Sequence, residues 1–175
     1  MVSPPQPRPR TQTQGARELL GLSRQPQEGT VVSIIAIDPG ASGGYAVDDN
    51  GIRVERWTGE ADFMEEVSNL DGLIAVVEEV PKFVGRMVPS SSIFTLAKNY
   101  GWILGVLAAY KVPTHLVRPQ LWQKGLTGVK AAKGSAKKRC LKEHAVRLFP
   151  EQKPTLATAD ALLILHHANQ NMNLR

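Results

Sequence analysis

The sequence predicts an α/β fold with a mixed five-stranded sheet flanked by helices. Two observations lead to this prediction. Short apolar runs with the lengths of buried strands occur in the first half of the chain, and helix-like segments alternate with strand-like ones after them. The chain has 175 residues, of which 42% are hydrophobic, and this suffices for one domain with a substantial core.

Composition divides the chain at about residue 30. Residues 1–30 are rich in Pro, Gln and Arg, and we expect a disordered tail there and one folded domain over 31–175. The tail has no continuous apolar core, so no signal peptide is predicted, whereas an organellar transit peptide and a DNA-contacting arm both fit it. With one cysteine, Cys140, and no apolar stretch of membrane-spanning length, the expected location is the cytoplasm, in association with the nucleoid.

Turn sequences separate the first three predicted strands. A strand over 31–37 runs into Asp38-Pro39-Gly40, where Pro and Gly favour a bend. A second strand over 43–47 is joined to a third over 52–57 by Asp49-Asn50-Gly51, which is typical of a hairpin turn.

Helices and strands then alternate. A helix over 60–69 is followed by a strand over 73–77, and Ser91 or Ser92 is expected to cap a long helix that reaches about Tyr110. The apolar face of the first of these helices is expected to contain Phe63, Met64, Val67 and Leu70.

The last part of the chain contains one short strand and three helical segments. The strand covers 114–117, and about one helical turn follows over 118–124. Ser135 is expected to cap a helix that ends near Phe149. Pro154 and Thr155 precede the last helix, which is expected to end near Met172.

One stripe of the long central helix carries small residues at helical spacing. Small residues allow another element to approach closely, and each glycine costs about 1 kcal/mol of helix stability relative to alanine. Packing against the sheet and packing against a second copy of the chain both explain the stripe. Its members are Ala97, Gly101, Gly105 and Ala108.

Asp38 is the most informative residue of the chain. It ends an apolar run, and a buried strand has no use for an unpaired charge. A divalent cation explains the carboxylate, although an Asp before Pro and Gly is also a common turn residue. Glu78 after the 73–77 strand and Asp160 near the start of the last helix repeat the pattern. Acids so distant in sequence can converge on one cation.

As a set, the segments IDPG, VVEEVP and ADALLI resemble the RuvC-type Holliday junction resolvases of the ribonuclease H-like superfamily in order and spacing. The resemblance extends from about residue 32 to about residue 169. It implies a ribonuclease H-like fold, with Asp38, Glu78 and Asp160 as catalytic residues and metal ligands. The implied activity is that of an endodeoxyribonuclease that uses Mg²⁺, with Mn²⁺ as a substitute, to nick four-way junctions symmetrically as a homodimer and leave 5′ phosphates.

The chain departs from the family at one position. The family has a further acid three or four residues before the last Asp, where this chain has Ala157 and Leu156. Glu79 is expected to point to the opposite face of its strand from Glu78. His167, two helical turns after Asp160, is a candidate to approach the site, although His is a poor ligand for magnesium.

Charge is unevenly distributed. Residues 111–153 contain eleven basic residues and two acids, whereas residues 33–100 contain five basic residues and eleven acids. A basic segment beside an acidic one suits a nuclease, and a solvated basic helix is the alternative. Trp122 is expected to pack over the sheet, with stacking on a base as the alternative. The expected DNA-binding residues are Lys82, Arg86, Lys124, Lys130, Lys133, Lys137, Lys138 and Lys142.

Three other functions fit parts of the sequence. The segment DPGASGGYAV also resembles the phosphate-binding turn of actin-like ATPases, which usually need two such domains. The missing acid also fits a catalytically impaired relative that binds junctions. The third alternative is a ribonuclease H-like nuclease that acts on another branched or hybrid substrate.

Overall fold

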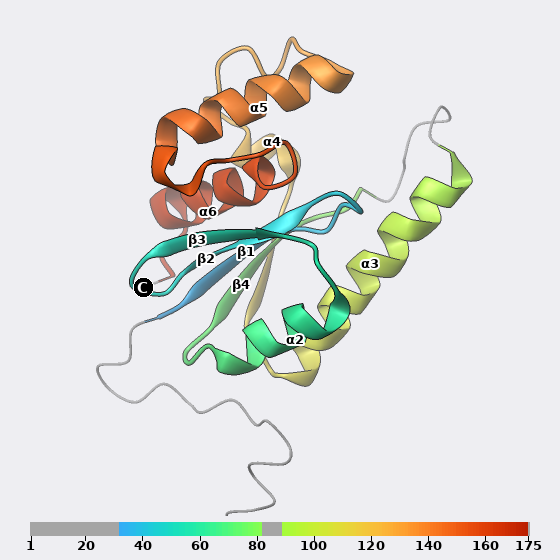
Figure 1. The fold of residues 1–175 in the computed structure, drawn as a ribbon, viewed down its shortest axis with the longest axis vertical. Coiled ribbons are helices and arrows are strands. Elements are labelled where there is room, and N and C mark those ends of the chain that lie inside the picture. Colours follow the sequence, from blue (N-terminus) through green and yellow to red (C-terminus); the bar gives the residue numbers. More distant parts are fainter. Residues whose placement is uncertain (1–31, 82–88, 175) are drawn as a thin grey trace, which may run out of the picture.

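A computed structural model describes residues 32–81 and 89–174. It contains a five-stranded sheet in the order β3-β2-β1-β4-β5 (Figure 1). The strands are β1 (Ile34–Asp38), β2 (Gly44–Asp48), β3 (Ile52–Arg56), β4 (Ile74–Glu78) and β5 (Thr114–Val117). The predicted tail over 1–30 and the predicted DNA-binding residues Lys82 and Arg86 lie outside the described residues.

The sheet is mixed, which confirms the predicted fold class. The strands β1, β2 and β3 form an antiparallel meander, and Asn50 adopts a positive φ of 84° in the turn between β2 and β3. The strands β1, β4 and β5 run parallel to one another. The carboxyl ends of these three parallel strands therefore meet at one edge of the sheet, where ligand sites of α/β proteins commonly lie.

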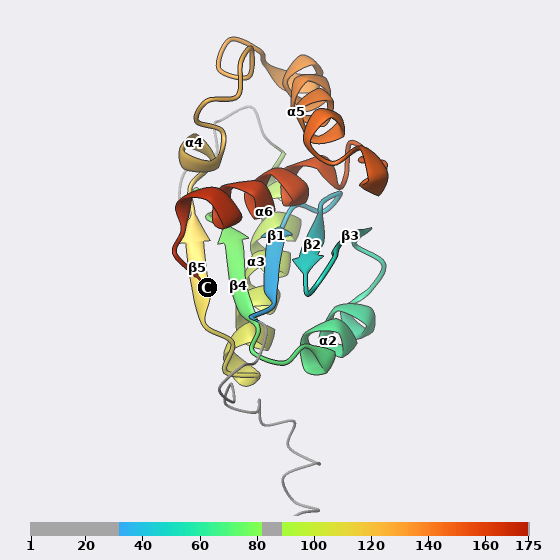
Figure 2. The ribbon, with the colours of Figure 1, turned by 90° about the vertical axis from the view of Figure 1, so that its left-hand side faces the viewer.

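Helices cover both faces of the sheet (Figures 1 and 2). On one face, α2 (Glu60–Asn69) and α3 (Ser90–Ala109) bury a cluster that includes Phe63, Ile103 and Leu107. On the other face lie α4 (Pro119–Trp122), α5 (Gly134–Leu148) and α6 (Ala159–Asn171), and α6 contributes an almost continuous buried run from Ala161 to Leu165. A short 3-10 helix, η1 (Pro150–Gln152), connects α5 to the segment before α6.

Two predicted helix caps are wrong. The helix α3 begins at Ser90 and follows Pro89, and neither Ser91 nor Ser92 caps it. The helix α5 begins at Gly134 after Lys133, so Ser135 already lies inside the helix. A serine near each predicted helix start was the signal for these caps. The observed N-cap residues, Pro89 and Lys133, lie two or three residues earlier in the sequence.

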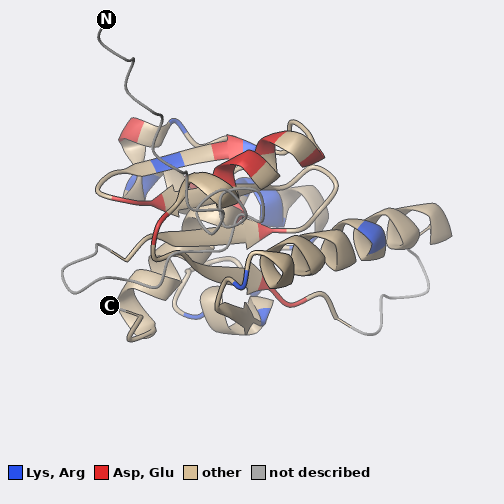
Figure 3. Ribbon diagram, turned by 90° about the horizontal axis from the view of Figure 1, so that it is seen from below, with Lys and Arg blue, Asp and Glu red and all other residues tan. Residues whose placement is uncertain are grey.

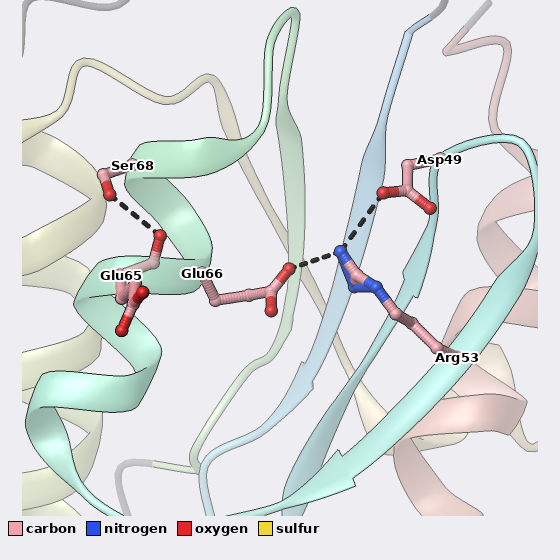
Figure 4. A network of polar contacts seen from close by, with 5 residues as sticks. All are labelled: Asp49, Arg53, Glu65, Glu66 and Ser68. Atoms are coloured by element: carbon pink, nitrogen blue, oxygen red, sulfur yellow. Dashed lines mark hydrogen bonds and ion pairs between the residues drawn. The ribbon is translucent and has the colours of Figure 1, made fainter.

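The predicted apolar face of α2 is also partly wrong. Phe63 and Val67 are buried, but Met64 is 40% exposed. The half-buried Glu66 of α2 binds Arg53 of β3, and Arg53 also binds Asp49 at 3.1 Å (Figure 4). This network ties the β2–β3 hairpin to α2.

The small-residue stripe of α3 does not pack against the sheet, so the first of the two explanations, packing against the sheet, is wrong. The helix turns Ile103, Val106 and Leu107 toward the sheet. Gly101 and Gly105 are exposed, and no atom lies within 4 Å of the position that a Cβ would occupy on either of them.

Within the described part of the chain, no helix is long and apolar enough to span a bilayer.

Candidate active site

Strand alternation turns Asp38 and Glu78 toward the α6 face of the sheet. Successive side chains of a strand point to opposite faces. Ile34 and Ala36 of β1 and Val76 of β4 all belong to the core cluster under α6. Asp38 and Glu78 each lie two residues beyond a member of this cluster, so they share its face. The parallel register pairs Ile37 with Val77, and this makes the two acids neighbours on adjacent strands.

The helix α6 brings the third acid to the same place. Asp160 lies in the first turn of α6, which packs across β1 and β4 (Figure 2). A tight turn fixes this end of the helix: the Thr155 amide donates to the Thr158 hydroxyl at 2.9 Å, and the Thr155 carbonyl accepts from the Ala159 amide at 3.1 Å. The sheet and α6 thus bring together three acids distant in sequence.

The turn after β1 is shaped around the Asp38 carboxylate. The Gly40 amide donates a hydrogen bond to Asp38 Oδ1 at 2.9 Å, and the Gly43 amide closes the turn onto the Gly40 carbonyl. A Cβ on Gly43 would lie 2.5 Å from the Asp38 carbonyl oxygen and 2.7 Å from the carboxylate carbon. Only glycine leaves room for the carboxylate at this point. The Trp57 indole donates to the Asp38 carbonyl oxygen at 3.0 Å and holds the turn from its other side.

Burial and proximity raise the pKa of all three acids. Desolvation raises the pKa of Glu78 to about 8, and the nearby Asp38 and Asp160 charges add to the effect. Desolvation and the Asp38 charge raise the pKa of Asp160 to about 6. Desolvation also raises the pKa of Asp38, although the Gly40 amide and Lys138 oppose it. The acids therefore interact electrostatically and lack enough positive charge to ionise together at their ordinary pKa values.

Two lysines of α5 supply part of this missing charge. Lys138 lowers the pKa of Asp38 and Asp160, and Lys137 lowers the pKa of Glu78 and Asp160. Both were predicted as DNA-binding residues, and the structure places them beside the three acids. The other predicted residues within the described part, Lys124, Lys130 and Lys133, are exposed in the segment between α4 and α5, whereas Lys142 on α5 is half-buried.

The three acids are neighbours, but their side chains as placed are not arranged as ligands around one metal ion. Among residues 32–81 and 89–174, no three acid, histidine or cysteine side chains come close enough together to hold a metal ion as they are placed. The chemistry of the three acids nevertheless fits a hard divalent cation, because carboxylate oxygens are its preferred ligands and its charge would offset their mutual repulsion.

None of the candidates among the described residues replaces the absent fourth acid. Ala157 lies in the turn before α6, and Leu156 is 49% exposed. Glu79 faces away from Glu78 and pairs with Arg118 at 3.0 Å. His167 contacts Asn171, and burial and the neighbouring His166 lower its pKa, so the groups that act on it within the described part of the chain do not include the three acids.

Sequence reasoning missed two tryptophans at the site. Trp57 donates its indole N–H to the Asp38 carbonyl and so stabilises the turn after β1. Its position one residue after β3 could have indicated this contact, because β3 pairs with β2 and the Trp57 amide donates to the Gly43 carbonyl at 3.2 Å. Trp122 was predicted to pack over the sheet, and its burial in the α6-side core, with 3% exposure, confirms this over stacking on a base. Its position near Glu78 was not predicted.

The charged groups are segregated over the molecule. Figure 3 shows acidic residues gathered over α2 and the β2–β3 hairpin, while α3 carries a single charged residue, Lys98. The candidate site thus lies at the sheet edge next to the basic α5, on the face away from most of the acidic surface of α2.

The chain is similar in fold to RuvC. No protein-family model and no curated protein matches its sequence. The structure of Thermus thermophilus RuvC in complex with a Holliday junction substrate matches with a TM-score of 0.52 and 17% identity, over 80% of this chain and 96% of that one. A second T. thermophilus RuvC structure matches with a TM-score of 0.51 and 17% identity, over 79% and 96% of the two chains. The predicted ribonuclease H-like fold is confirmed.

Proposed function

We propose that this chain, which has the fold of RuvC, is a divalent-metal-dependent endonuclease that cuts four-way DNA junctions. The observation that carries the proposal is the convergence of three carboxylates, Asp38, Glu78 and Asp160, beside Lys137 and Lys138. A purely structural role does not explain three neighbouring buried acids with raised pKa values, because each acid destabilises the charged form of the others.

The donor set is suited to Mg²⁺ or Mn²⁺. Asp38, Glu78 and Asp160 would hold the ion with carboxylate oxygens, and Gly43 leaves the space that the Asp38 carboxylate occupies. When bound, the ion would lower the pKa of a coordinated water and stabilise negative charge on the leaving oxygen.

The chain's own residues position the DNA and the attacking water. Lys137 and Lys138 place two positive charges beside the acids, so they would bind the scissile phosphate and reduce its repulsion by the carboxylates. The ionised Glu78 would accept a hydrogen bond from the attacking water and orient it. Lys124, Lys130 and Lys133 lie exposed between α4 and α5 and would bind phosphates further along the DNA without sequence preference.

The uncovered face of α3 supports a homodimer. Gly101 and Gly105 are open to solvent, and Phe94 on the same helix is 72% exposed. A second α3 packed on this face would cover the exposed apolar surface and explain glycines that otherwise weaken the helix. A twofold dimer would place two sites on a substrate that is itself approximately twofold symmetric.

A second candidate function is junction binding without cleavage. It is favoured by Ala157 and Leu156, because neither provides a ligand for a second ion. Under this alternative, the basic surface would bind junctions while the acids remain catalytically incomplete.

Cleavage of a synthetic four-way junction separates the two candidates. The assay compares Mg²⁺ and Mn²⁺, with duplex DNA and an RNA–DNA hybrid as substrate controls and Asp38→Asn as the site control. Paired symmetric nicks that need the metal and Asp38 would support the nuclease. Tight junction binding without nicks in either metal would favour the binding protein, and preferred cleavage of the hybrid would show a different nuclease.

A further inference from the structure

The indole of Trp122 lies next to Glu78 because of the strand register. The parallel pairing places Val117, the last residue of β5, opposite Glu78 of β4. The helix α4, which ends at Trp122, follows β5 after Arg118 alone, so it lies at the carboxyl end of β5 and near α6 (Figure 2). The Trp122 ring belongs to the core cluster on the same sheet face as Glu78.

The indole N–H of Trp122 has no hydrogen-bond partner among the described residues, although it is fully buried. Buried donors without a partner are rare, and an indole can donate but not accept. The acid at this position is Glu78: Trp122 lowers the Glu78 pKa as a hydrogen-bond donor would, although their separation or angle in the structure does not meet the geometry of a hydrogen bond. The Trp122 N–H therefore lies near Glu78, on the same face of the sheet, without a hydrogen bond in the structure.

We propose that Trp122 is a positioning residue, whose buried indole N–H donates a hydrogen bond to Glu78 in the carboxylate orientation that binds a divalent cation. The inference rests on the proposed metal-dependent function. A hydrogen bond to one carboxylate oxygen fixes the orientation of the group, so the other oxygen faces the cation. Groups that orient a metal ligand in this way typically change metal affinity by about 10–100-fold when they are removed.

The other two tryptophans provide internal references. Trp57 donates to the Asp38 backbone and belongs to the site turn, so it does not serve as a neutral control. Trp102 of α3 packs against Phe63 on the opposite sheet face, with ring centroids 5.6 Å apart. Trp102→Phe is therefore a matched control for replacing an indole by a benzene ring.

Calorimetric titration with Mn²⁺ measures the affinity part of the proposal. Trp122→Phe keeps the aromatic ring and removes the donor, and we expect it to weaken Mn²⁺ binding by about tenfold or more. Trp102→Phe should bind Mn²⁺ like the unmodified chain. Equal affinities of Trp122→Phe and the unmodified chain would overturn the role of Trp122.

The indole resonances give a second readout that needs no Trp122 variant. The chain has three tryptophans, so a ¹⁵N spectrum contains three indole N–H signals, which Trp57→Phe and Trp102→Phe assign. Saturation with Mg²⁺ should move the Trp122 signal downfield and leave that of Trp102 in place. A Trp122 signal that stays fixed while calorimetry shows binding would overturn the positioning role alone. Absence of any metal binding that depends on Asp38 would overturn the proposed function as well.

Discussion

Replacing Glu78 by glutamine should stabilise the metal-free protein at alkaline pH, although it should abolish cleavage. Glu78 has an ordinary pKa of 4.5 in the unfolded chain and a pKa of about 8 in the fold, chiefly because of burial. Between these values the unfolded chain has lost the proton while the folded chain retains it. Stability therefore falls as pH rises through this window, and the loss is complete above about pH 8.

The size of the effect follows from the same two pKa values. Each pH unit between the folded and unfolded pKa corresponds to about 1.4 kcal/mol. A gap of about 3.5 units sets an upper limit of roughly 5 kcal/mol at pH 9. The site can relax and admit water, so the real effect should be smaller than this limit. We expect Glu78→Gln to raise the free energy of unfolding by about 2–5 kcal/mol at pH 9 and by less than about 1 kcal/mol at pH 5.

Urea unfolding in EDTA at pH 5 and pH 9 measures this difference. Glu79→Gln is the matched control, because it changes the adjacent carboxylate, which pairs with the exposed Arg118 on the other sheet face. The control should follow the unmodified chain at both pH values. Equal unfolding free energies for Glu78→Gln and the unmodified chain at pH 9 would refute the argument that Glu78 is a destabilising buried acid. Added Mg²⁺ should stabilise the unmodified chain more than the Glu78→Gln variant.

Further substitutions test the other parts of the site. Asp38→Asn should abolish cleavage, because an amide replaces a carboxylate ligand of the metal. It should leave junction affinity within about twofold in a gel-shift assay, because Asn has nearly the same size and shape as Asp; lost affinity would indicate that Asp38 has a structural role. Lys138→Ala with Lys142→Ala should weaken binding to all DNA sequences and reduce the slope of log affinity against log salt by about two, as fluorescence anisotropy would show; an unchanged slope would remove α5 from the DNA path. Gly43→Ala should displace the Asp38 carboxylate and lower the thermal midpoint and the cleavage rate, because its Cβ would lie 2.5 Å from the Asp38 carbonyl oxygen; Gly51→Ala, with open space around it, should change neither.

The fold was predictable because its determinants are local patterns. Apolar runs of strand length gave the five strands, and the Asp49-Asn50-Gly51 turn gave the hairpin. The acids at the ends of β1 and β4, Asp38 and Glu78, indicated where these strands leave the apolar core. Strand alternation then predicted that Glu79 would face away from Glu78, and its pairing with Arg118 confirms this.

Other features depend on tertiary geometry that no local pattern contains. The spacing of Gly101 and Gly105 shows that they share a helix face but not whether that face meets the sheet or solvent. The burial of Trp122 was predictable from its apolar neighbours, whereas its proximity to Glu78 depends on the β4–β5 register. Lys137 and Lys138 read as basic surface in the sequence, and only the packing of α5 beside α6 brings them to the acids.

The three acids come from the beginning, the middle and the end of the folded domain, and this has a consequence during synthesis. A nascent chain can pair β1 with β4 once residue 78 has emerged, but Asp160 is supplied only when α6 packs across the completed sheet. Contacts between such distant segments form late, because the intervening chain must close first. Incomplete chains therefore lack the third carboxylate, and the proposed nuclease site is complete only in the finished domain.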